Sequence, residues 1–503
     1  MDPKFIAAAR AAFPSTGPAV VLGAPVLANE CHPEPLISIP LAMMNRHGLI
    51  AGATGTGKTK TLQLMAEQLS GAGVPVFLAD VKGDVSGIGA PGEANDKVTT
   101  RAKDTGWTWK AQACPVEFLS LTGARGAQVR ATVSSFGPLL LSKVLGLNET
   151  QTSVLMLVFK YCDDHQLELF DFADLRAVLQ HLSGEGAADL KDYGGMSKAT
   201  VGVLMREMVE LEQQGALAFF GEPELALADL LQTERDGRGL VTVLELTDVQ
   251  DKPALFSTFL MWMLARLYHE LPEVGDVERP KLVFFFDEAH LLFDGASKAF
   301  LEQVQQVVRL IRSKGVGIFF ITQSPKDVPA DVLGQLGHKV QHALRAFTPE
   351  DEAALRAAAR TYPTTPFYEV EATLQALGIG EALVTALSPN GVPTPPFATR
   401  MVPPASRMGP LTEPEMQQRL GSSAQVKKYA AAVNRESAEE KLASRAAAAP
   451  APAATAAPAR RGEKPPPSAL EEILKSPLTR TVAGVVTRGL MGALLGPPRR
   501  RRY

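Results

Sequence analysis

The segment from Gly52 to Thr59, with the sequence GATGTGKT, is the feature that most restricts how this chain can fold. It fills every position of the pattern G-x-x-x-x-G-K-[ST], in which glycines let backbone N–H groups turn inward around phosphates. Such a loop lies between a buried strand and a helix, whose N-terminus adds the positive end of its dipole. Residues 47–53 are mostly apolar and residues 59–69 carry apolar residues at helical spacing. The context therefore favours a phosphate-binding loop over the alternative, a glycine-rich turn that matches by chance.

This loop predicts ATP and Mg²⁺ as cofactors. Lys58 is expected to reach the β- and γ-phosphates, and the Thr59 hydroxyl is expected to bind the magnesium ion. The residues expected to contact the nucleotide are Gly52, Ala53, Thr54, Gly55, Thr56, Gly57, Lys58, Thr59 and Lys60.

The spacing of apolar residues predicts an α/β fold with a mainly parallel sheet. A second buried strand, residues 74–80, follows the predicted helix and completes a β-α-β unit. The span after it, up to residue 236, is predicted to be an insertion that is largely helical after Gly137, with a capping box at 148–151 and an amphipathic helix at 196–214. Further strands are predicted at 240–246, 281–286, 316–321 and 338–347, and a buried helix at 254–267.

Two acids follow the most apolar of these strands. The run from Leu282 to Phe286 ends in Asp287 and Glu288, and an acid at the end of a central parallel strand faces the nucleotide crevice. Asp287 is expected to hold magnesium through water, and Glu288 to polarise the attacking water. The alternative is a core strand with a solvated acidic end, which the phosphate-binding loop makes less favourable.

Other strand ends supply weaker candidates. Gln323 ends the strand at 316–321 and would lie beside Asp287 and Glu288 if the two strands are adjacent, where it could hold the γ-phosphate or the water. Asp80 and Lys82 end the strand after the phosphate-binding loop and could contact the magnesium shell and the phosphates. An ordinary polar strand end and a plain turn are the respective alternatives.

Composition restricts the class of protein further. Hydrophobic residues make up 46% of the 503 residues and charged residues 21%, as in a soluble globular protein. No apolar run is long enough for a membrane span, and the N-terminus lacks the layout of a signal peptide. The three cysteines form no metal-ligand pair, so a cytoplasmic location without membrane contact is expected. The net charge of −3 excludes a generally basic nucleic-acid coat but not local contacts with DNA.

In this order, the motifs resemble the HerA/FtsK superfamily of ring-forming, ATP-driven DNA pumps. The resemblance is closer to the bacterial HerA-like proteins of the DUF853 family and extends over most of the chain. The segments that carry it are 46–51 before the phosphate-binding loop, 80–87, 287–290, 314–318, 322–325, 341–349 and 488–492.

The resemblance implies a RecA-like ATPase core, a hexameric ring of identical subunits and duplex DNA as the substrate. In this superfamily an arginine from one subunit completes the neighbour's site, and Arg345 and Arg312 are the positions that could match. For each of them, an ordinary surface arginine is the alternative. A nuclease or another protein is a candidate partner that the sequence does not identify.

The predicted organisation combines the motifs with changes in composition. A β-rich lead-in is expected at 1–45, the RecA-like core at 46–90 and 237–400, and a mainly helical insertion at 91–236. An extension with an Ala/Pro-rich disordered linker follows at 401–467, and a helical C-terminal segment with a basic end at 468–503.

Two functions remain from these observations. The first is an oligomeric, helicase-like ATPase that translocates duplex DNA. The alternative is a nucleotide-dependent scaffold or switch that acts on a protein partner without moving DNA. The acidic net charge slightly favours the alternative, whereas Glu288 and Gln323 together favour hydrolysis.

Overall fold

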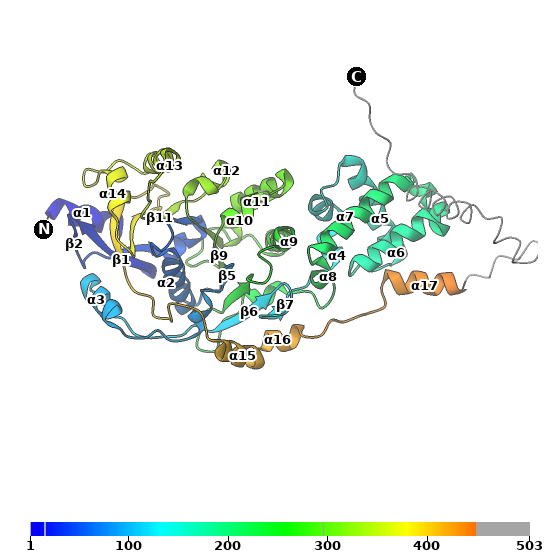
Figure 1. Cartoon of the computed structure of the whole chain (residues 1–503), viewed down its shortest axis with the longest axis horizontal. Coiled ribbons are helices and arrows are strands. Elements are labelled where there is room, and N and C mark those ends of the chain that lie inside the picture. The colour runs from blue at the N-terminus through cyan, green and yellow to red at the C-terminus, as the bar shows by residue number, and fades with distance from the viewer. Residues whose placement is uncertain (1, 15–16, 295, 449–503) are drawn as a thin grey trace, which may run out of the picture. The chain divides into compact units, whose positions relative to one another are not determined.

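Apolar strands that alternate with helices along the chain pair in parallel at the centre of the molecule. The computed structural model describes residues 2–14, 17–294 and 296–448. Its 13-stranded sheet has the order β2-β1-β13-β12-β11-β4-β10-β9-β5-β8-β6-β7, with β3 paired to β1 (Figure 1). The strands are β1 (Ala19–Leu27), β2 (Glu30–Cys31), β3 (Ile37–Pro40), β4 (Gly48–Ala51), β5 (Val76–Asp80), β6 (Val116–Ser120), β7 (Ala127–Gln128), β8 (Val241–Glu245), β9 (Leu282–Phe286), β10 (Val316–Thr322), β11 (His338–His342), β12 (Glu381–Thr385) and β13 (Phe397–Met401).

Every pairing from β11 through β4, β10, β9, β5, β8 and β6 to β7 is parallel. The pairings of β11 with β12, β12 with β13 and β13 with β1 are antiparallel. The predicted α/β class with a mainly parallel sheet is therefore confirmed.

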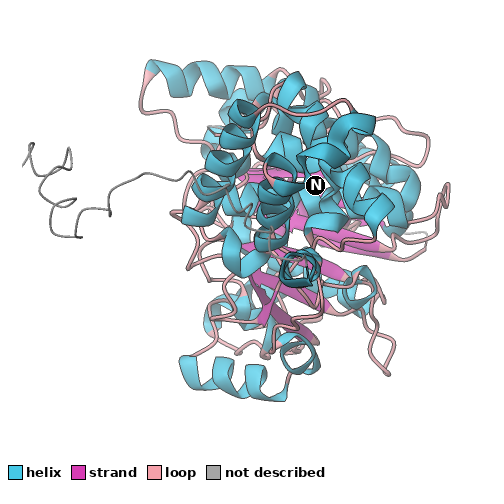
Figure 2. Ribbon diagram, turned by 90° about the vertical axis from the view of Figure 1, so that its right-hand side faces the viewer, coloured by secondary structure: helices cyan, strands magenta, loops and turns pink. Residues whose placement is uncertain are grey.

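Helices pack on both faces of this sheet (Figure 2). The α-helices are α1 (Pro3–Ala12), α2 (Lys58–Gly71), α3 (Asp96–Thr105), α4 (Val133–Val144), α5 (Glu149–His165), α6 (Phe172–Ser183), α7 (Lys198–Gln213), α8 (Ala216–Phe219), α9 (Pro253–Glu270), α10 (His290–Phe293), α11 (Lys298–Leu310), α12 (Ala330–Leu333), α13 (Pro349–Ala359), α14 (Val370–Ala376), α15 (Glu413–Ser422), α16 (Ala424–Tyr429) and α17 (Ala438–Ala448). The 3-10 helices are η1 (Leu41–Arg46), η2 (Ser86–Gly89), η3 (Glu185–Tyr193), η4 (Leu227–Leu230), η5 (Ile311–Lys314) and η6 (Pro325–Asp327).

Alternation of side chains along β9 divides the core into two layers, because successive strand residues point to opposite faces. Leu282, Phe284 and Phe286 belong to a buried cluster with residues of α9 and α11, and this cluster continues through α4 into α5, α6 and α7. Val283 and Phe285 belong to a second buried cluster on the other face, which includes residues of α1 and α2. All five side chains are buried, which explains why this strand is apolar at every position.

The predicted helices agree with the structure where their local signals are strong. In α5 the Asn148 side chain accepts the N–H of Gln151, and the Gln151 side chain accepts the N–H of Asn148, so the predicted capping box is present. The predicted helices at 196–214 and 254–267 correspond to α7 and α9.

The span predicted to be helical also contributes strands. Its strand β6 pairs with β8 and carries β7 at its other edge, so the central sheet extends beyond the strands that the sequence predicts. The N-terminal segment, predicted to be β-rich, also contains the helix α1, and two further strands, β12 and β13, follow β11.

The strand predicted at 338–347 is too long, because β11 ends at His342. Beyond it the chain turns out of the sheet: the Ala343 carbonyl accepts the N–H of Ala53, and the Leu344 N–H donates to Leu374. Phe347 is 88% exposed.

Residues 1–446 form one compact unit. The extension after residue 400 belongs to it in part, since Tyr429 of α16 is buried and its hydroxyl contacts Asp229. The predicted C-terminal segment at 468–503 and the predicted linker from residue 449 onward lie outside the described residues. Among the described helices, none combines the length and the apolar character of a membrane span.

The two-layer core predicts a large cost for truncating a central strand. Phe285 is completely buried and its ring stacks on Phe319, with centroids 5.2 Å apart. Phe285→Ala is expected to lower the free energy of unfolding by about 3–5 kcal/mol, because it leaves a cavity between β9 and β10. Phe347→Ala removes the same atoms from an exposed side chain and should leave chemical denaturation unchanged. Equal midpoints for the two variants would contradict this packing.

Candidate active site

The phosphate-binding loop connects β4 to α2 and is held by both neighbours of β4. The Gly52 N–H donates to the Thr322 carbonyl of β10 at 3.2 Å, and the Ala53 N–H donates to Ala343 after β11 at 2.9 Å. Gly52 has φ +154°, and a Cβ there would lie 2.5 Å from the Cβ of His342. The loop therefore requires glycine where it passes β11.

Lys58 is the first residue of α2, and its ammonium group lies inside the loop. Its Nζ donates to the carbonyl oxygens of Gly52, at 2.8 Å, and of Ala53, at 3.2 Å. Burial lowers the pKa of Lys58, and the charge of Glu288 partly opposes this shift. Thr59 and Lys60 follow in the first turn of α2 and are half-buried. Burial also lowers the pKa of Lys60, while the charges of Asp84 and Asp80 act in the opposite direction.

A buried histidine that the sequence did not single out lies beneath this loop. His342, at the end of β11, has its Nε2 2.9 Å from Thr61 Oγ1 of α2 and its Nδ1 2.8 Å from the Glu381 carbonyl of β12. Burial lowers the pKa of His342 to about 4, so the ring is neutral at pH 7. It connects the phosphate-binding helix to the antiparallel part of the sheet without adding charge.

The loop before β12 makes a second connection. The Gly380 N–H donates to the Thr56 carbonyl at 2.9 Å, and the guanidinium of Arg101 in α3 donates to the carbonyls of Ile379 and Gly380, both at 2.9 Å. A Cβ on Gly57 would lie 3.4 Å from Gly380, so the two loops are in contact. These residues come from distant parts of the chain, and no local pattern identifies them.

Asp287 follows β9 and is a buried acid with one unpaired oxygen. The Glu288 N–H donates to its Oδ1 at 2.9 Å, whereas its Oδ2 has no hydrogen-bond partner. Burial, followed by the negative charges of Glu288, Asp80 and Asp84, raises the pKa of Asp287 to about 7. The carboxylate is thus poised to gain from a nearby cation.

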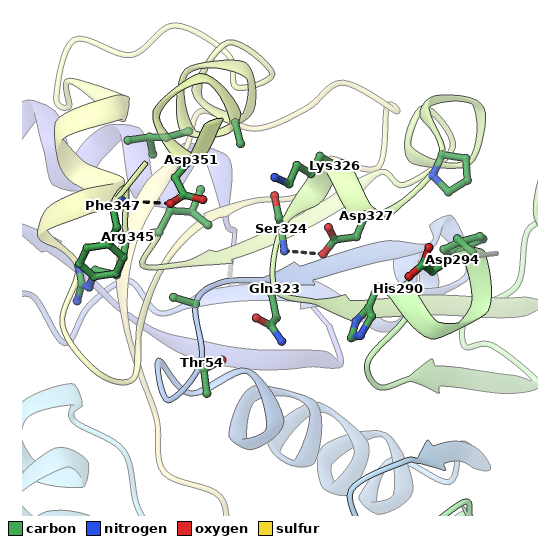
Figure 3. A pocket seen from close by; sticks show the side chains of 16 residues that line it. Thr54, His290, Asp294, Gln323, Ser324, Lys326, Asp327, Arg345, Phe347 and Asp351 are labelled. Atoms are coloured by element: carbon green, nitrogen blue, oxygen red, sulfur yellow. Dashed lines mark hydrogen bonds between the residues drawn. The ribbon is translucent and has the colours of Figure 1, made fainter. Parts of the chain in front are cut away.

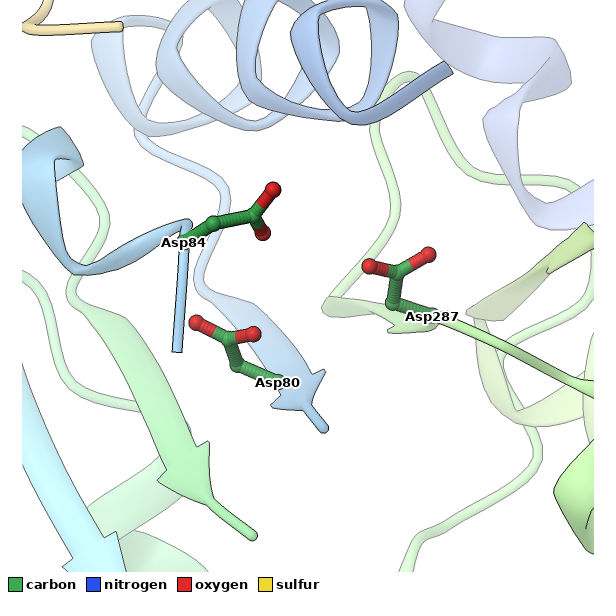
Figure 4. Close-up of side chains that lie close together, drawn as sticks. All are labelled: Asp80, Asp84 and Asp287. Carbon is green, nitrogen blue, oxygen red and sulfur yellow. The ribbon is translucent and has the colours of Figure 1, made fainter. Parts of the chain in front are cut away.

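Three carboxylates gather at this edge of the sheet (Figure 4). Oxygens of Asp80, Asp84 and Asp287 all lie within 4.8 Å of one another. The carboxylate of Asp80 already accepts hydrogen bonds from the turn that follows it, from the N–H groups of Lys82, Gly83 and Val85 at 2.8–3.2 Å. Asp84 Oδ1 and Asp287 Oδ2 are buried and unpaired. Hard oxygen donors in this arrangement suit Mg²⁺, and Asp84 is a candidate ligand that sequence reasoning missed.

Glu288 is buried and paired through one of its oxygens, while Oε2 has no hydrogen-bond partner. Lys82 Nζ forms an ion pair with its Oε1, and His290 Nδ1 lies 3.2 Å from its Oε2. Burial alone would raise the pKa of Glu288, but the hydrogen bond and charge of Lys82 outweigh it and hold the pKa below its ordinary value. Its backbone has φ +48°, which is uncommon for a residue with a side chain. Lys82 therefore contacts the acid at β9, although the sequence suggested phosphates as its partner.

Gln323 lies between the two motifs, because β10 pairs with β4 on one side and with β9 on the other. This is the adjacency on which its predicted role depended. It is exposed and lines a cavity of about 1100 Å³ together with Ala53, Thr54 and His290 (Figure 3). Its role in holding the γ-phosphate or the water stays a prediction.

The two candidate arginines lie in different places. Arg345 lines the same cavity, and its guanidinium donates to the carbonyls of Gln375 and Leu377 at the C-terminus of α14. Arg312 lies in η5 before β10, at the edge of the sheet opposite the phosphate-binding loop, 3.8 Å from Asp276 Oδ1. Within the described residues, no hydrogen bond or ion pair joins either arginine to the phosphate-binding loop, and a role for either in a neighbour's site stays a prediction.

Comparison with known proteins gives one family. Residues 26–502 match the family described as Helicase HerA-like C-terminal. No curated protein is significantly similar to the chain.

Several solved structures are similar at low sequence identity. The bacterial conjugative coupling protein TrwBdeltaN70 is 15% identical, with 77% of this chain and 91% of that chain covered and a TM-score of 0.46. VirB4 of Thermoanaerobacter pseudethanolicus is 15% identical, with 81% and 99% covered and a TM-score of 0.48. The plasmid coupling protein TrwB in complex with ADP and Mg²⁺ is 16% identical, with 80% and 94% covered and a TM-score of 0.47.

The different surroundings of the two acids predict different defects. Glu288→Gln keeps the shape but removes the proton acceptor, so nucleotide should bind with nearly unchanged affinity and be turned over very slowly. Asp287→Asn removes one of the three carboxylates that face a cation, so the Mg²⁺ concentration required for binding should rise. Nucleotide affinity over a magnesium titration, with single-turnover hydrolysis, measures both effects. Equal, mild changes in the two variants would show that the roles are misassigned.

Proposed function

The chain belongs to the HerA-like helicase C-terminal family, and we propose that it is a magnesium-dependent ATPase motor that translocates duplex DNA. The observation that carries the hydrolytic part is the arrangement at the edge of the sheet. Lys58 lies in the phosphate-binding loop, Glu288 lies at the tip of β9, and β10 with Gln323 lies between them. A phosphate bound in the loop then faces an acid, an amide and a pair of unpaired carboxylate oxygens.

Each side chain has one role in the proposed reaction. Lys58 moves from the loop carbonyls to the β- and γ-phosphate oxygens, where it offsets negative charge. The oxygen of the attacking water, which Gln323 orients, forms a bond to the γ-phosphorus while Glu288 accepts the proton of that water. The bond between the γ-phosphorus and the β–γ bridging oxygen breaks, and ADP leaves. Thr59 and Asp287, with Asp84, would hold Mg²⁺, which when bound neutralises charge on the phosphates.

We propose the domain organisation that the motifs suggest, with the ATPase core at 46–90 and 237–400. The span 91–236 is then an insertion whose helices α4 to α7 pack against the core and whose strand β6 extends the core sheet. A cytoplasmic location is proposed from the three cysteines, which are all free.

A second function deserves the same test, because the net charge of −3 gives no general attraction for DNA. In it, the ATPase is a scaffold or switch that changes its binding to a protein partner, such as a nuclease, when nucleotide is hydrolysed. Both functions use the same active site and differ only in what responds to turnover.

Duplex DNA should separate the two functions. A DNA motor is expected to hydrolyse ATP several-fold faster with long duplex DNA, and the stimulation should decrease as salt rises, because phosphate contacts release counterions. Steady-state ATPase rates at several salt concentrations measure this effect. Lys58→Ala is the control and should remove turnover with and without DNA while the chain stays folded. A DNA-independent rate at low salt would favour the switch.

A hexameric ring with shared active sites is the proposed assembly. An arginine that completes the neighbour's site would be worth roughly 10³-fold or more in kcat. Mixing Arg345→Ala subunits with Lys58→Ala subunits should therefore restore part of the activity, since some interfaces regain two intact halves. Arg312→Ala takes the place of Arg345→Ala in a parallel series. Absence of rescue at every mixing ratio, for both arginines, would exclude a shared site built on either one.

A further inference from the structure

The ion pair between Lys82 and Glu288 places a cation on the residue that should act as a base. Lys82 Nζ contacts Glu288 Oε1, while His290 Nδ1 lies 3.2 Å from Oε2. The ion pair occupies Oε1 and fixes the orientation of the buried carboxylate, while Oε2 has no hydrogen-bond partner. The contact therefore works against the chemistry that Glu288 performs in the proposed function.

The two partners differ in how freely they can move. The Glu288 side chain is only 5% exposed, whereas the Lys82 side chain is 47% exposed. The backbone of Lys82 is fixed, because Asp80 Oδ1 accepts the N–H groups of Lys82 and Gly83. Separation of the pair thus requires only a rotation of the Lys82 side chain into solvent, with no change in β5 or β9.

The surroundings also provide a reason for separation. Lys58 contributes a second positive charge near Glu288, and Lys82 projects from the same edge of the sheet as the phosphate-binding loop. An anion near this edge would compete with Glu288 for the half-exposed ammonium group of Lys82. In the proposed function this anion is a phosphate group, either of the nucleotide or of DNA.

We propose that Lys82 is a positioning residue that restrains Glu288: the ion pair occupies Oε1 and fixes the carboxylate, and phosphate releases it to turn toward the attacking water by drawing Lys82 away. This inference rests on the proposed ATPase function and concerns its regulation. Hydrolysis is then slow while the pair is intact and faster when the pair is open.

Removal of the ammonium group tests the restraint. In the absence of DNA, Lys82→Ala and Lys82→Gln should raise kcat several-fold with little change in KM for ATP, and the further stimulation by duplex DNA should shrink. Lys82→Arg can still form the ion pair and should restore the low rate. Lys97→Ala, an exposed lysine on α3, is the matched control and should not differ from the unmodified chain.

Three kinetic outcomes would contradict the restraint or identify the source of the phosphate. A lower kcat, or a higher KM with constant kcat, in both Lys82→Ala and Lys82→Gln would show that Lys82 assists turnover or binds the nucleotide, and would overturn the restraint. An unchanged rate in both variants would overturn it as well. Loss of the DNA stimulation in Lys82→Ala at saturating ATP would identify DNA phosphate as the source, whereas a raised kcat with the DNA stimulation unchanged would leave the nucleotide as the source.

Failure of the proposed function has a different signature. If neither the unmodified chain nor any Lys82 variant hydrolyses ATP, the ATPase assignment fails and the restraint fails with it. If the unmodified chain has turnover that Lys58→Ala removes, but Lys82→Ala shows no gain, only the restraint fails. The double variant Lys82→Ala/Glu288→Gln must be as slow as Glu288→Gln, because a rate gain without Glu288 would contradict release of that residue.

Discussion

Parallel pairing of β4, β10, β9 and β5 is the constraint on which the candidate site depends. In a parallel sheet every strand ends at the same edge, so the phosphate-binding loop, Gln323, the acids after β9 and the turn after β5 are brought together by topology alone. Neighbouring strands lie about 4.8 Å apart, so the insertion of β10 separates β4 from β9 by about two such spacings. In the proposed function, the γ-phosphate and the attacking water would occupy the space across these two spacings, between Lys58 and Glu288.

The edge of the sheet where these strands end also brings together several buried carboxylates, which lower the stability of the fold. Buried acids without counterions are expensive, and Asp287 keeps one oxygen unpaired. Its neighbours Asp80 and Asp84 add repulsion, while Lys58 and Lys60 lie on the other side at the start of α2. Such an arrangement is less stable by itself than with a cation among the carboxylates, which is typical of sites where binding, rather than folding, determines the residues present.

The sequence predicted the parts of the site whose signals are local. The loop lies between a strand and a helix as its pattern requires, and the acids follow β9, whose five apolar residues allow no other place than the core. It did not predict His342, Gly380 or Arg101, because their contacts join segments separated by roughly 280 to 320 residues. The short strand β6 was missed for the same reason: its partner β8 lies more than a hundred residues later, with several helices between them.

The hydrogen bond from Gly380 to Thr56 connects the phosphate-binding loop to the antiparallel strands of the sheet. Gly380 precedes β12, β12 pairs with β13, and β13 pairs with β1, so the loop is joined by backbone contacts to the N-terminal strand. Arg101 of α3 also donates a hydrogen bond to the Gly380 carbonyl. The phosphate-binding loop therefore cannot shift without either breaking these contacts or moving β12, β13 and β1 with it. In the same way, a movement of the N-terminal strand would reach the residues that surround the phosphate.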